Sequence, residues 1–531
     1  MSSADITQTI DVPTLRGWLA DGGEIAFIDV REDGQHGDAH PLLAVSLPYS
    51  RLELDIARLV PRRNCRIVLV DGGDGVAARA ARRMAALGYS ALHTLGGGVG
   101  AWSAAGYPLF PSTNVPSKGF AEVVEIDSHT PHITAAELDR LRRDGEKMVV
   151  LDSRTVEEFN RFHVPGAMTC PGAELVQRFD DLVPDRDTLV VVSCAGRTRS
   201  IIGAQSLINA GVPNRVVSLS GGTQGWRLGG LELERDTRAS LAPVSATAVA
   251  AGRARADMVA GRFGVCRIDR ATLAAWQNDD ARTTFLLDVR TPEEYAAGHL
   301  PGAISTPGGQ LVQAIDRWVG TRGARLVLVD DSGTRAIMSA HWLKQMGWDV
   351  QVLDGGLDGA ALETGAGTAP PKLPDVLNLG VAEAAHWLHE GAAAIVIGSS
   401  AEYRKAHPED AVWAIRPHLD RLPASVLRAT RIAVFAEDAA IGTLAAADLA
   451  EISARPVALV QGGIAAWRAA GRPFEASPDA PPDSEQIDYV FWNHDRHDGN
   501  QGAMRAYLQW ELDLPGEIEK DGLSGFRIGT A

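Results

Sequence analysis

The stretch LVVVSCAGRTRSIIGAQSLINAG, residues 189–211, decides how this chain is interpreted. Its first four residues are all apolar, which is typical of a parallel strand buried on both faces. From Ile201 the pattern becomes helical and ends at Gly211. A short loop that contains Cys194 joins the strand to the helix. Ligands of parallel α/β sheets bind beyond the carboxyl ends of the strands, so this loop is the predicted site.

The same pattern recurs four times along the 531 residues. Each copy combines an apolar strand, a turn containing Pro, a second apolar strand with a helix, and a Gly-Gly corner. In the first three copies the first strand ends in Asp-x-Arg, and the fourth copy is the weakest match. The corners read LGGGVGAW (95–102), LSGGTQGW (219–226), LDGGLDGA (353–360) and VQGGIAAW (460–467). Repeats this long are whole domains rather than solenoid units.

We therefore predict an α/β protein of four tandem domains, each a central parallel sheet flanked by helices, followed by a helical tail. The predicted domain ranges are 1–113, 120–237, 262–364 and 375–476, with the tail at 485–531. The Ala-rich stretch 239–261 is either a linker or a helix that bridges two halves of the chain. In the tail, AMRAYLQWELDLP (503–515) predicts an amphipathic helix that docks through its Leu and Trp side chains.

The composition excludes several classes of function. Lys and Arg number 51 against 67 Asp and Glu, a formal net charge of −16, which argues against nucleic acid or an anionic membrane as partner. Four cysteines are too few for a disulfide scaffold. The sequence shows no secretory signal and no apolar run long enough to span a bilayer. We expect a cytoplasmic protein that needs no cofactor.

The loop at Cys194 has the features of an anion site. Its backbone N–H groups turn inward, a helix begins beside it, and Arg197 and Arg199 add positive charge, so we expect the pKa of the thiol to be lowered. The alternative is a buried cysteine that only packs at the end of the strand. Alignment of the copies places Asp71, Asp330 and Ala436 at the cysteine position. Only the second copy offers a nucleophile.

These motifs together resemble the rhodanese family of sulfurtransferases. The resemblance implies that Cys194 takes up a sulfane sulfur as a persulfide and passes it to an acceptor. It also implies that the loop residues cradle the persulfide, with Arg197 and Arg199 meeting the anionic donor, and that Asp152 and Arg154 form an ion pair supporting the loop. The loop residues are Ala195, Gly196, Arg197, Thr198, Arg199 and Ser200.

The resemblance further implies a small-molecule sulfur donor, namely thiosulfate, 3-mercaptopyruvate or glutathione persulfide, and cyanide or a thiol as acceptor. Two alternatives stay open: a sulfur relay to a protein partner, and a mainly non-catalytic scaffold. A cysteine phosphatase of similar fold is disfavoured, because it needs Arg at the position that Ser200 occupies. No oligomeric state is predicted.

Three further predictions concern the pairing of the domains, Cys170 and a motif in the tail. Copies one and two are predicted to pair, with the Cys194 loop facing their interface, and copies three and four to form an added degenerate pair. Cys170 is expected to pack in the core, although a role in resolving the persulfide is open. The tail motif HDRHDG (494–499) is interpreted as lining a cleft or anchoring the tail rather than as a metal site.

Overall fold

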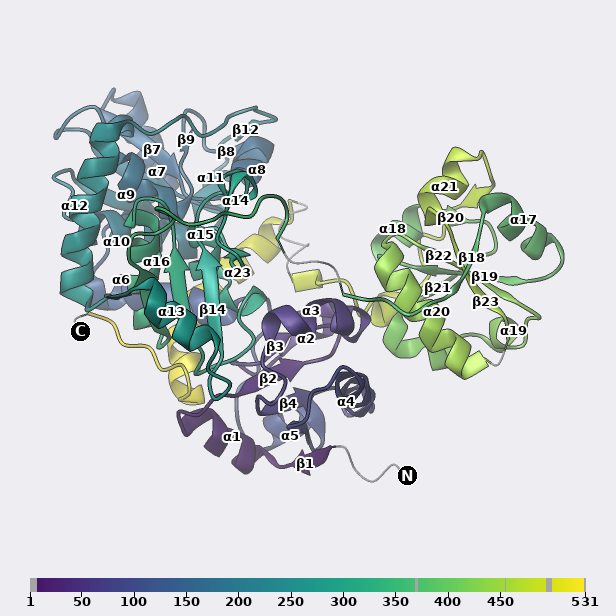
Figure 1. Cartoon of the computed structure of the whole chain (residues 1–531). Coiled ribbons are helices and arrows are strands. Elements are labelled where there is room, and N and C mark those ends of the chain that lie inside the picture. Colours follow the sequence, from purple (N-terminus) through teal and green to yellow (C-terminus); the bar gives the residue numbers. More distant parts are fainter. Residues whose placement is uncertain (1–6, 368–370, 454, 493–498, 530–531) are drawn as a thin grey trace.

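The computed structural model describes residues 7–367, 371–453, 455–492 and 499–529. These residues form four five-stranded parallel sheets, each flanked by helices (Figure 1). In every sheet the strands lie in the order first, fifth, fourth, second, third, counted along that domain. The α/β prediction of four tandem domains with a helical tail is therefore confirmed.

The first two domains have the following elements. The first sheet consists of β1 (Gln8–Ile10), β5 (Leu92–Leu95), β4 (Ile67–Val70), β2 (Ala26–Asp29) and β3 (Val45–Ser46), with helices α1 (Val12–Ala20), α2 (Asp33–Asp38), α3 (Leu52–Leu59), α4 (Val76–Ala86) and α5 (Gly98–Ala104). The second consists of β6 (His132–Ile133), β11 (Val216–Leu219), β10 (Leu189–Ser193), β7 (Met148–Asp152) and β9 (Met168–Thr169), with α7 (Ala135–Arg143), α8 (Val156–Arg161), α9 (Leu175–Leu182), α10 (Thr198–Asn209) and α11 (Gly222–Leu228).

The other two domains repeat this arrangement. The third sheet consists of β13 (Cys266–Ile268), β17 (Asp349–Leu353), β16 (Arg325–Val329), β14 (Thr284–Asp288) and β15 (Ile304–Ser305), with α13 (Arg270–Gln277), α14 (Pro292–Ala297), α15 (Gly308–Gln313) and α16 (Thr334–Gln345). The fourth consists of β18 (Leu377–Leu379), β23 (Val457–Val460), β22 (Ile432–Ala436), β19 (Ala393–Ile397) and β21 (Val412–Ala414), with α17 (Val381–His389), α18 (Ser400–Lys405), α19 (Ala424–Leu427), α20 (Ala439–Ser453) and α21 (Gly463–Ala469).

Two helices link consecutive domains, and a third lies in the tail. Helix α6 (Val115–Ser128) links the first domain to the second, α12 (Ala246–Phe263) links the second to the third, and α23 (Gln501–Asp521) belongs to the tail. The Ala-rich stretch is thus mainly a helix. Two short antiparallel pairs close the edges of the second and fourth domains, β8 (Phe162–His163) with β12 (Glu234–Arg235) and β20 (His407–Pro408) with β24 (Phe474–Glu475).

A glycine corner fixes the loop after the central strand in all four domains. Gly222 has a φ of +50°, and a Cβ there would lie 2.2 Å from the carbonyl oxygen of Cys194. That close approach requires glycine. In the other domains, a Cβ on the equivalent glycine would lie equally close to the carbonyl oxygen at the strand end. The distances are 2.2 Å from Gly98 to Asp71, 2.2 Å from Gly356 to Asp330, and 1.9 Å from Gly463 to Ala436. The corner confirms that these four strand-end residues are structurally equivalent.

The predicted pairing of the domains is wrong. The second and third domains share one continuous apolar core, in which α12 packs against both α9 and α16. The small residues Gly252 and Ala256 allow this close packing, since a Cβ on Gly252 would lie 3.0 Å from the backbone of α9. The first domain instead contacts the fourth, where the buried Arg416 pairs with Glu53 at 2.6 Å and with Asp448 at 2.7 Å.

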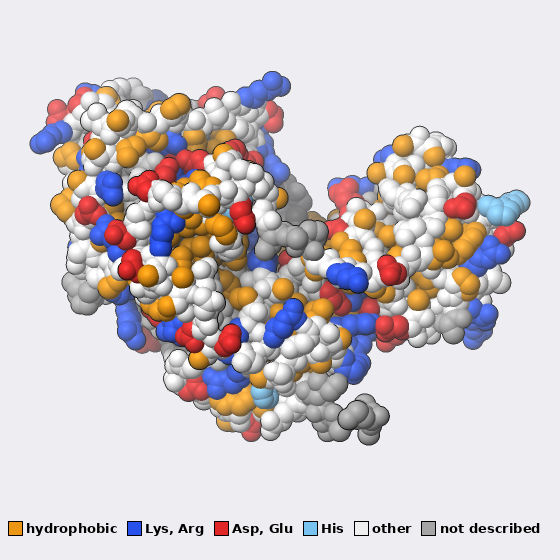
Figure 2. Space-filling view, viewed as in Figure 1, with side chains coloured by type: hydrophobic (Ala, Val, Ile, Leu, Met, Phe, Trp, Pro, Cys, Tyr) orange, Lys and Arg blue, Asp and Glu red, His pale blue; other side chains and the backbone are white. Residues whose placement is uncertain are grey.

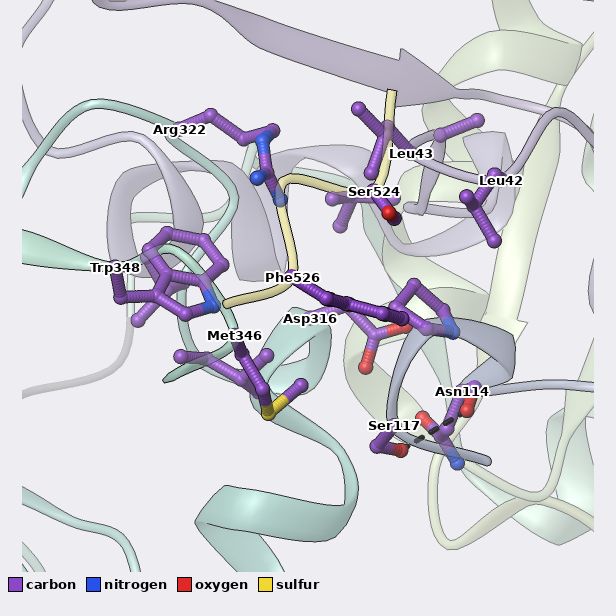
Figure 3. A pocket seen from close by; sticks show the side chains of 15 residues that line it. Leu42, Leu43, Asn114, Ser117, Asp316, Arg322, Met346, Trp348, Ser524 and Phe526 are labelled. Carbon is purple, nitrogen blue, oxygen red and sulfur yellow. Dashed lines mark hydrogen bonds between the residues drawn. The ribbon is translucent and has the colours of Figure 1, made fainter. Parts of the chain in front are cut away.

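The tail returns from the fourth domain to the body formed by the other three (Figure 1). Phe526 inserts where the first domain, α6 and the third domain meet, beside Leu43 and Trp348 (Figure 3). The cavity left there is about 30 Å³, which is room for one water molecule and no larger ligand. This junction is therefore a packing contact that ties the domains together.

Basic and acidic side chains are interspersed over the face shown in Figure 2 rather than gathered into a basic patch. Among the described residues, no helix has the length and apolar character needed to cross a membrane.

The glycine corner can be tested in the fourth domain, away from the cysteine. Gly463→Ala places a methyl group against the carbonyl of Ala436 at a left-handed backbone position, so we expect a loss of roughly 1–3 kcal/mol in stability. Thermal melting of the variant should show a lower midpoint than the wild type.

The matched control is Gly261→Ala. Gly261 lies in α12 with open space around its Cα, and there alanine should be neutral or stabilising. If both variants melt like the wild type, the corner does not constrain the fold.

Candidate active site

Cys194 lies directly after β10, and its side chain is only 2% exposed. Strand β10 is central in its sheet, paired with β7 on one side and β11 on the other. The carbonyl of Cys194 accepts a hydrogen bond from the backbone N–H of Thr223 at 2.8 Å. The sheet and the glycine corner thus hold both sides of the residue that begins the loop.

The first domain shows what this loop geometry binds. There Asp71 occupies the cysteine position, and its carboxylate accepts backbone N–H bonds from Gly73, Gly75 and Ala77 at 2.8, 3.1 and 3.0 Å. Three amides that converge on one anionic group form an anion cradle. In the third domain Asp330 accepts in the same way from the amides of Gly333 and Arg335, at 2.6 and 2.9 Å.

The second domain has the same loop with a thiol in place of the carboxylate. The charge of Arg199 and the hydroxyl and backbone N–H of Ser200 favour the thiolate of Cys194 and act to lower its pKa. Burial has the larger effect and raises the pKa of the Cys194 thiol above its usual value. The predicted lowering of this pKa is therefore wrong in direction, because the sequence does not show how completely the thiol is covered.

Arg199 is paired with Glu158 of α8. Its two terminal nitrogens donate to the two carboxylate oxygens at 2.6 and 2.7 Å. Burial disfavours the Glu158 carboxylate, but Arg199 and the backbone of Thr155 outweigh it and lower the pKa of Glu158 to about 2. The third domain repeats the pair as Arg335 with Glu294, at 2.7 Å. Since that domain has no nucleophile, the pair also has a structural purpose.

Arg197 is paired with two glutamates of α6. Its Nε and one Nη donate to Glu122 at 2.8 and 2.7 Å, and it also contacts Glu125. Each loop arginine therefore has its charge matched by carboxylates of the protein. The role of these arginines in binding a donor stays a prediction.

Asp152 and Arg154 form a buried ion pair at 2.7 Å. The guanidinium also donates to the carbonyl of Phe162, which ties the turn after β7 to the end of α8. The direct link to the loop comes from Ser153, whose hydroxyl donates to the carbonyls of Ser193 and Arg199 at 2.9 and 3.2 Å. Sequence reasoning missed Ser153.

Helix α23 covers the mouth of the loop. A Cβ on Gly196 would lie 3.2 Å from Oε2 of Glu511, 3.6 Å from the Tyr507 ring and 3.8 Å from Nε2 of Gln224. The predicted docking of α23 through Leu and Trp side chains is confirmed in part, because Leu514 is buried and Trp510 packs against the same apolar cluster, whereas Leu512 is exposed. The buried residues of α23 are Met504, Tyr507, Glu511, Leu514, Ile518 and Asp521.

The other cysteines lie in different surroundings. Cys170 is fully buried in the shared core, and burial raises the pKa of its thiol far above the usual range. Cys65 is buried and Cys266 is exposed, and all four cysteines are free. No group of acidic, His or Cys side chains that could hold a metal is found among the described residues. The tail motif HDRHDG lies outside them except for Gly499.

Comparison with known proteins decides the family. The model of the rhodanese-like domain matches residues 12–105, 134–228 and 269–362. The chain belongs to the rhodanese family. The fourth domain lies outside the matched residues but has the same order of strands as the other three.

The chain is similar over nearly its whole length to a solved structure of a thiosulfate sulfurtransferase from Pseudomonas aeruginosa. The two chains are 44% identical, with a TM-score of 0.93, over 98% of this chain and 100% of the other. The chain is also 37% identical over 102 residues to an HTH-type transcriptional regulator of Mycobacterium tuberculosis. That match covers 19% of the rhodanese and 44% of the regulator, less than half of the latter. The rhodanese is a sulfurtransferase.

Two groups of residues at the site were not predicted from the sequence. The Glu partners of the loop arginines include Glu158 and Glu294, which occupy the same position in the repeated motifs TVEEF and TPEEY, so the repeat could have identified them. Glu511 and Tyr507 come from the tail, which follows no repeat. No sequence pattern relates them to the loop.

The pair between Glu158 and Arg199 predicts a pH-dependent stability. The folded pKa of Glu158 lies near 2, below its usual 4.5, so its stabilising contribution is present above pH 4.5 and is lost as the pH falls towards 2. Glu158→Gln should therefore melt a few degrees below the wild type at neutral pH, and this difference should close in acid. The effect is small because the carboxylate is 40% exposed and screened by water.

The matched control for this pair is Glu157→Gln. Glu157 is the exposed neighbour of Glu158 and should have no effect on melting. A difference for Glu158→Gln that persists unchanged below pH 2 would contradict the assigned ion pair.

The covered thiol of Cys194 predicts slow alkylation at neutral pH. The exposed Cys266 serves as the reference within the same chain. With iodoacetamide, peptide mass mapping should show Cys266 modified first and Cys194 labelling that increases into the alkaline range. Faster labelling of Cys194 than of Cys266 at neutral pH would disprove both its burial and its raised pKa.

Proposed function

We propose that this sulfurtransferase moves sulfane sulfur from thiosulfate or a related donor through a persulfide on Cys194 to cyanide or a thiol. The supporting observation is the cradle of the first and third domains, where the same loop binds a carboxylate with its amides. In the second domain, the thiol of Cys194 occupies that position and can carry sulfur. A persulfide anion on Cys194 would extend into the same set of amides.

The proposed reaction has two displacements. The Cys194 thiolate attacks the sulfane sulfur of thiosulfate, the S–S bond breaks, and sulfite leaves with the electron pair. Cyanide then attacks the terminal sulfur of the persulfide, the new S–S bond breaks, and thiocyanate leaves while the Cys194 thiolate is restored. A thiol acceptor reacts in the same way as its thiolate and leaves as a persulfide.

The loop contributes by holding negative charge. Its amides and the start of α10 stabilise the thiolate and the persulfide in a site from which water is excluded. Arg199 adds positive charge next to the sulfur, and Glu158 holds the guanidinium in place. Ser153 fixes the two ends of the loop against the turn after β7.

We propose that the first, third and fourth domains are structural. The cradles of Asp71 and Asp330 are filled by the protein's own carboxylates, and the fourth loop has Ala436 at this position. The third domain shares its core with the second, the first domain contacts α23, and the fourth domain contacts the first through Arg416 and Glu53. Four free cysteines suit the reducing cytoplasm, where we place the activity.

Replacement of the nucleophile tests this proposal. Cys194→Ala should reduce the formation of thiocyanate from thiosulfate and cyanide by at least about 10²-fold, because no sulfur atom remains to form the persulfide. The colorimetric assay of thiocyanate measures this directly. The melting temperature should change little.

The control is Cys266→Ser, an exposed position that should keep full activity. Cys170→Ala tests whether the second buried thiol takes part, and we expect it to keep activity because Cys170 lies in the core. Full activity of Cys194→Ala would refute the proposed function.

A further inference from the structure

The loop that begins at Cys194 is closed to solvent. Cys194 itself is 2% exposed. The buried residues that follow it are Gly196, Arg197, Thr198 and Ser200. In the proposed reaction, a donor has to bring its sulfane sulfur into contact with the thiol, and an acceptor has to reach the persulfide. The protein therefore has to open at this loop in every turnover.

Two helices from outside the second sheet close the loop, and the first of them, α6, is fixed. Its Glu122 accepts hydrogen bonds from the Arg197 guanidinium at 2.8 and 2.7 Å. The same helix places Phe120, Ala121 and Val124 in the core shared by the second and third domains. Helix α6 cannot leave the loop without disrupting that core.

The second helix, α23, contacts the loop through polar side chains. A Cβ on Gly196 would lie 3.2 Å from Oε2 of Glu511, so the helix lies directly on the loop. Oε1 of Glu511 accepts hydrogen bonds from the hydroxyls of Tyr507 at 2.8 Å and Thr198 at 3.4 Å. Polar contacts of this kind are replaced by contacts with water at a small net cost when two surfaces separate.

The first turn of α23 is incompletely packed. A cavity of about 210 Å³ lies between this turn and the second domain, and its lining includes Gln501, Met504 and Leu233. One turn further on, the Leu508 side chain lies 3.4 Å from the place that a Cβ on Gly221 of the glycine corner would take. The cavity interrupts the apolar packing of this end of the helix.

The other end of α23 is anchored in an apolar cluster. Leu514 and Ile518 are buried there together with Leu43 and Phe110 of the first domain and Val115 of α6. One end of the helix is therefore fixed to the body of the protein, while the other end covers the loop.

Pro515 and Gly516 lie between the residues that cover the loop and most of the anchored end. Pro515 has no N–H to donate to the carbonyl of Glu511, so the hydrogen bonding of the helix is interrupted at this point. Glycine is, after proline, the residue that favours a helix least. A Cβ on Gly516 would meet open space, so packing does not require glycine there.

We propose that residues 501–513 of α23 form a lid that bends away at Pro515 and Gly516 to admit the sulfur donor and the acceptor to Cys194. This inference rests on the proposed function, because it concerns the access of the two substrates to the nucleophile. The polar underside of the lid gives a closed state that opens readily, and the anchored end returns the lid to the same place. While it is closed, the lid keeps water and other thiols from the persulfide.

The test stiffens the bending point with Gly516→Ala in the full-length protein. Alanine favours the helix over glycine by about fivefold in equilibrium constant, so the open lid should be about fivefold less populated. We expect alkylation of Cys194 by iodoacetamide to slow by about that factor relative to the exposed Cys266. Loading of Cys194 by a low concentration of thiosulfate, followed by intact mass, should slow in parallel.

A second variant, Leu508→Ala, loosens the lid where it contacts the glycine corner. Here alkylation and sulfur loading of Cys194 should both become several-fold faster, with little change in melting temperature. The matched control is Gly261→Ala, the same substitution in α12 at a position that also has open space around it. It should leave both rates at Cys194 unchanged, which separates bending of α23 from a general gain in helix stability.

The alkylation does not depend on sulfur transfer, so two failures can be distinguished. If Gly516→Ala and Leu508→Ala alkylate at the wild-type rate, or Gly261→Ala slows alkylation as much as Gly516→Ala does, the lid is refuted and the proposed function stands. If alkylation responds as expected but neither thiosulfate nor the other proposed donors load Cys194 in any variant, the proposed function is refuted and the lid stands.

Discussion

The structure depends on one close contact, between the carbonyl at the end of each central strand and the second glycine of the Gly-Gly corner. In all four domains a Cβ at that glycine would lie within about 2.2 Å of the carbonyl oxygen. The contact fixes where the strand ends and where the following loop turns. In the first and third domains this loop leads to a helix whose first amides donate to the residue at the strand end, and Cys194 occupies the equivalent position in the second domain.

The four copies act as an internal comparison of that position. Asp71 and Asp330 receive the loop amides on their own carboxylates, whereas Cys194 brings a sulfur to the same place. The acidic copies show that this loop can hold a carboxylate, and Cys194 is the one thiol among the four equivalent positions. They also show that the glutamate pair of Arg199 does not depend on a thiol, since its equivalent Arg335 makes the same pair in a loop without one.

The repeat made the fold and the loop predictable from sequence. Apolar strands, the Asp-x-Arg turns and the corners are local patterns, so the α/β class, the four domains and the equivalence of Cys194 with Asp71, Asp330 and Ala436 could all be inferred. The pairing of domains and the cover over the loop could not, because they depend on α12 and α23, which join distant segments. The raised pKa of Cys194 follows from that burial, and so it was also beyond local patterns.

The central claim is that sulfur is carried by Cys194 and by no other cysteine of the chain. Intact mass spectrometry after incubation with thiosulfate, followed by peptide mapping, tests it most directly. The account predicts a gain of one sulfur atom per chain, located on the peptide containing Cys194 and absent from Cys194→Ser. A gain that persists in Cys194→Ser, or that maps to Cys65, Cys170 or Cys266, would contradict it.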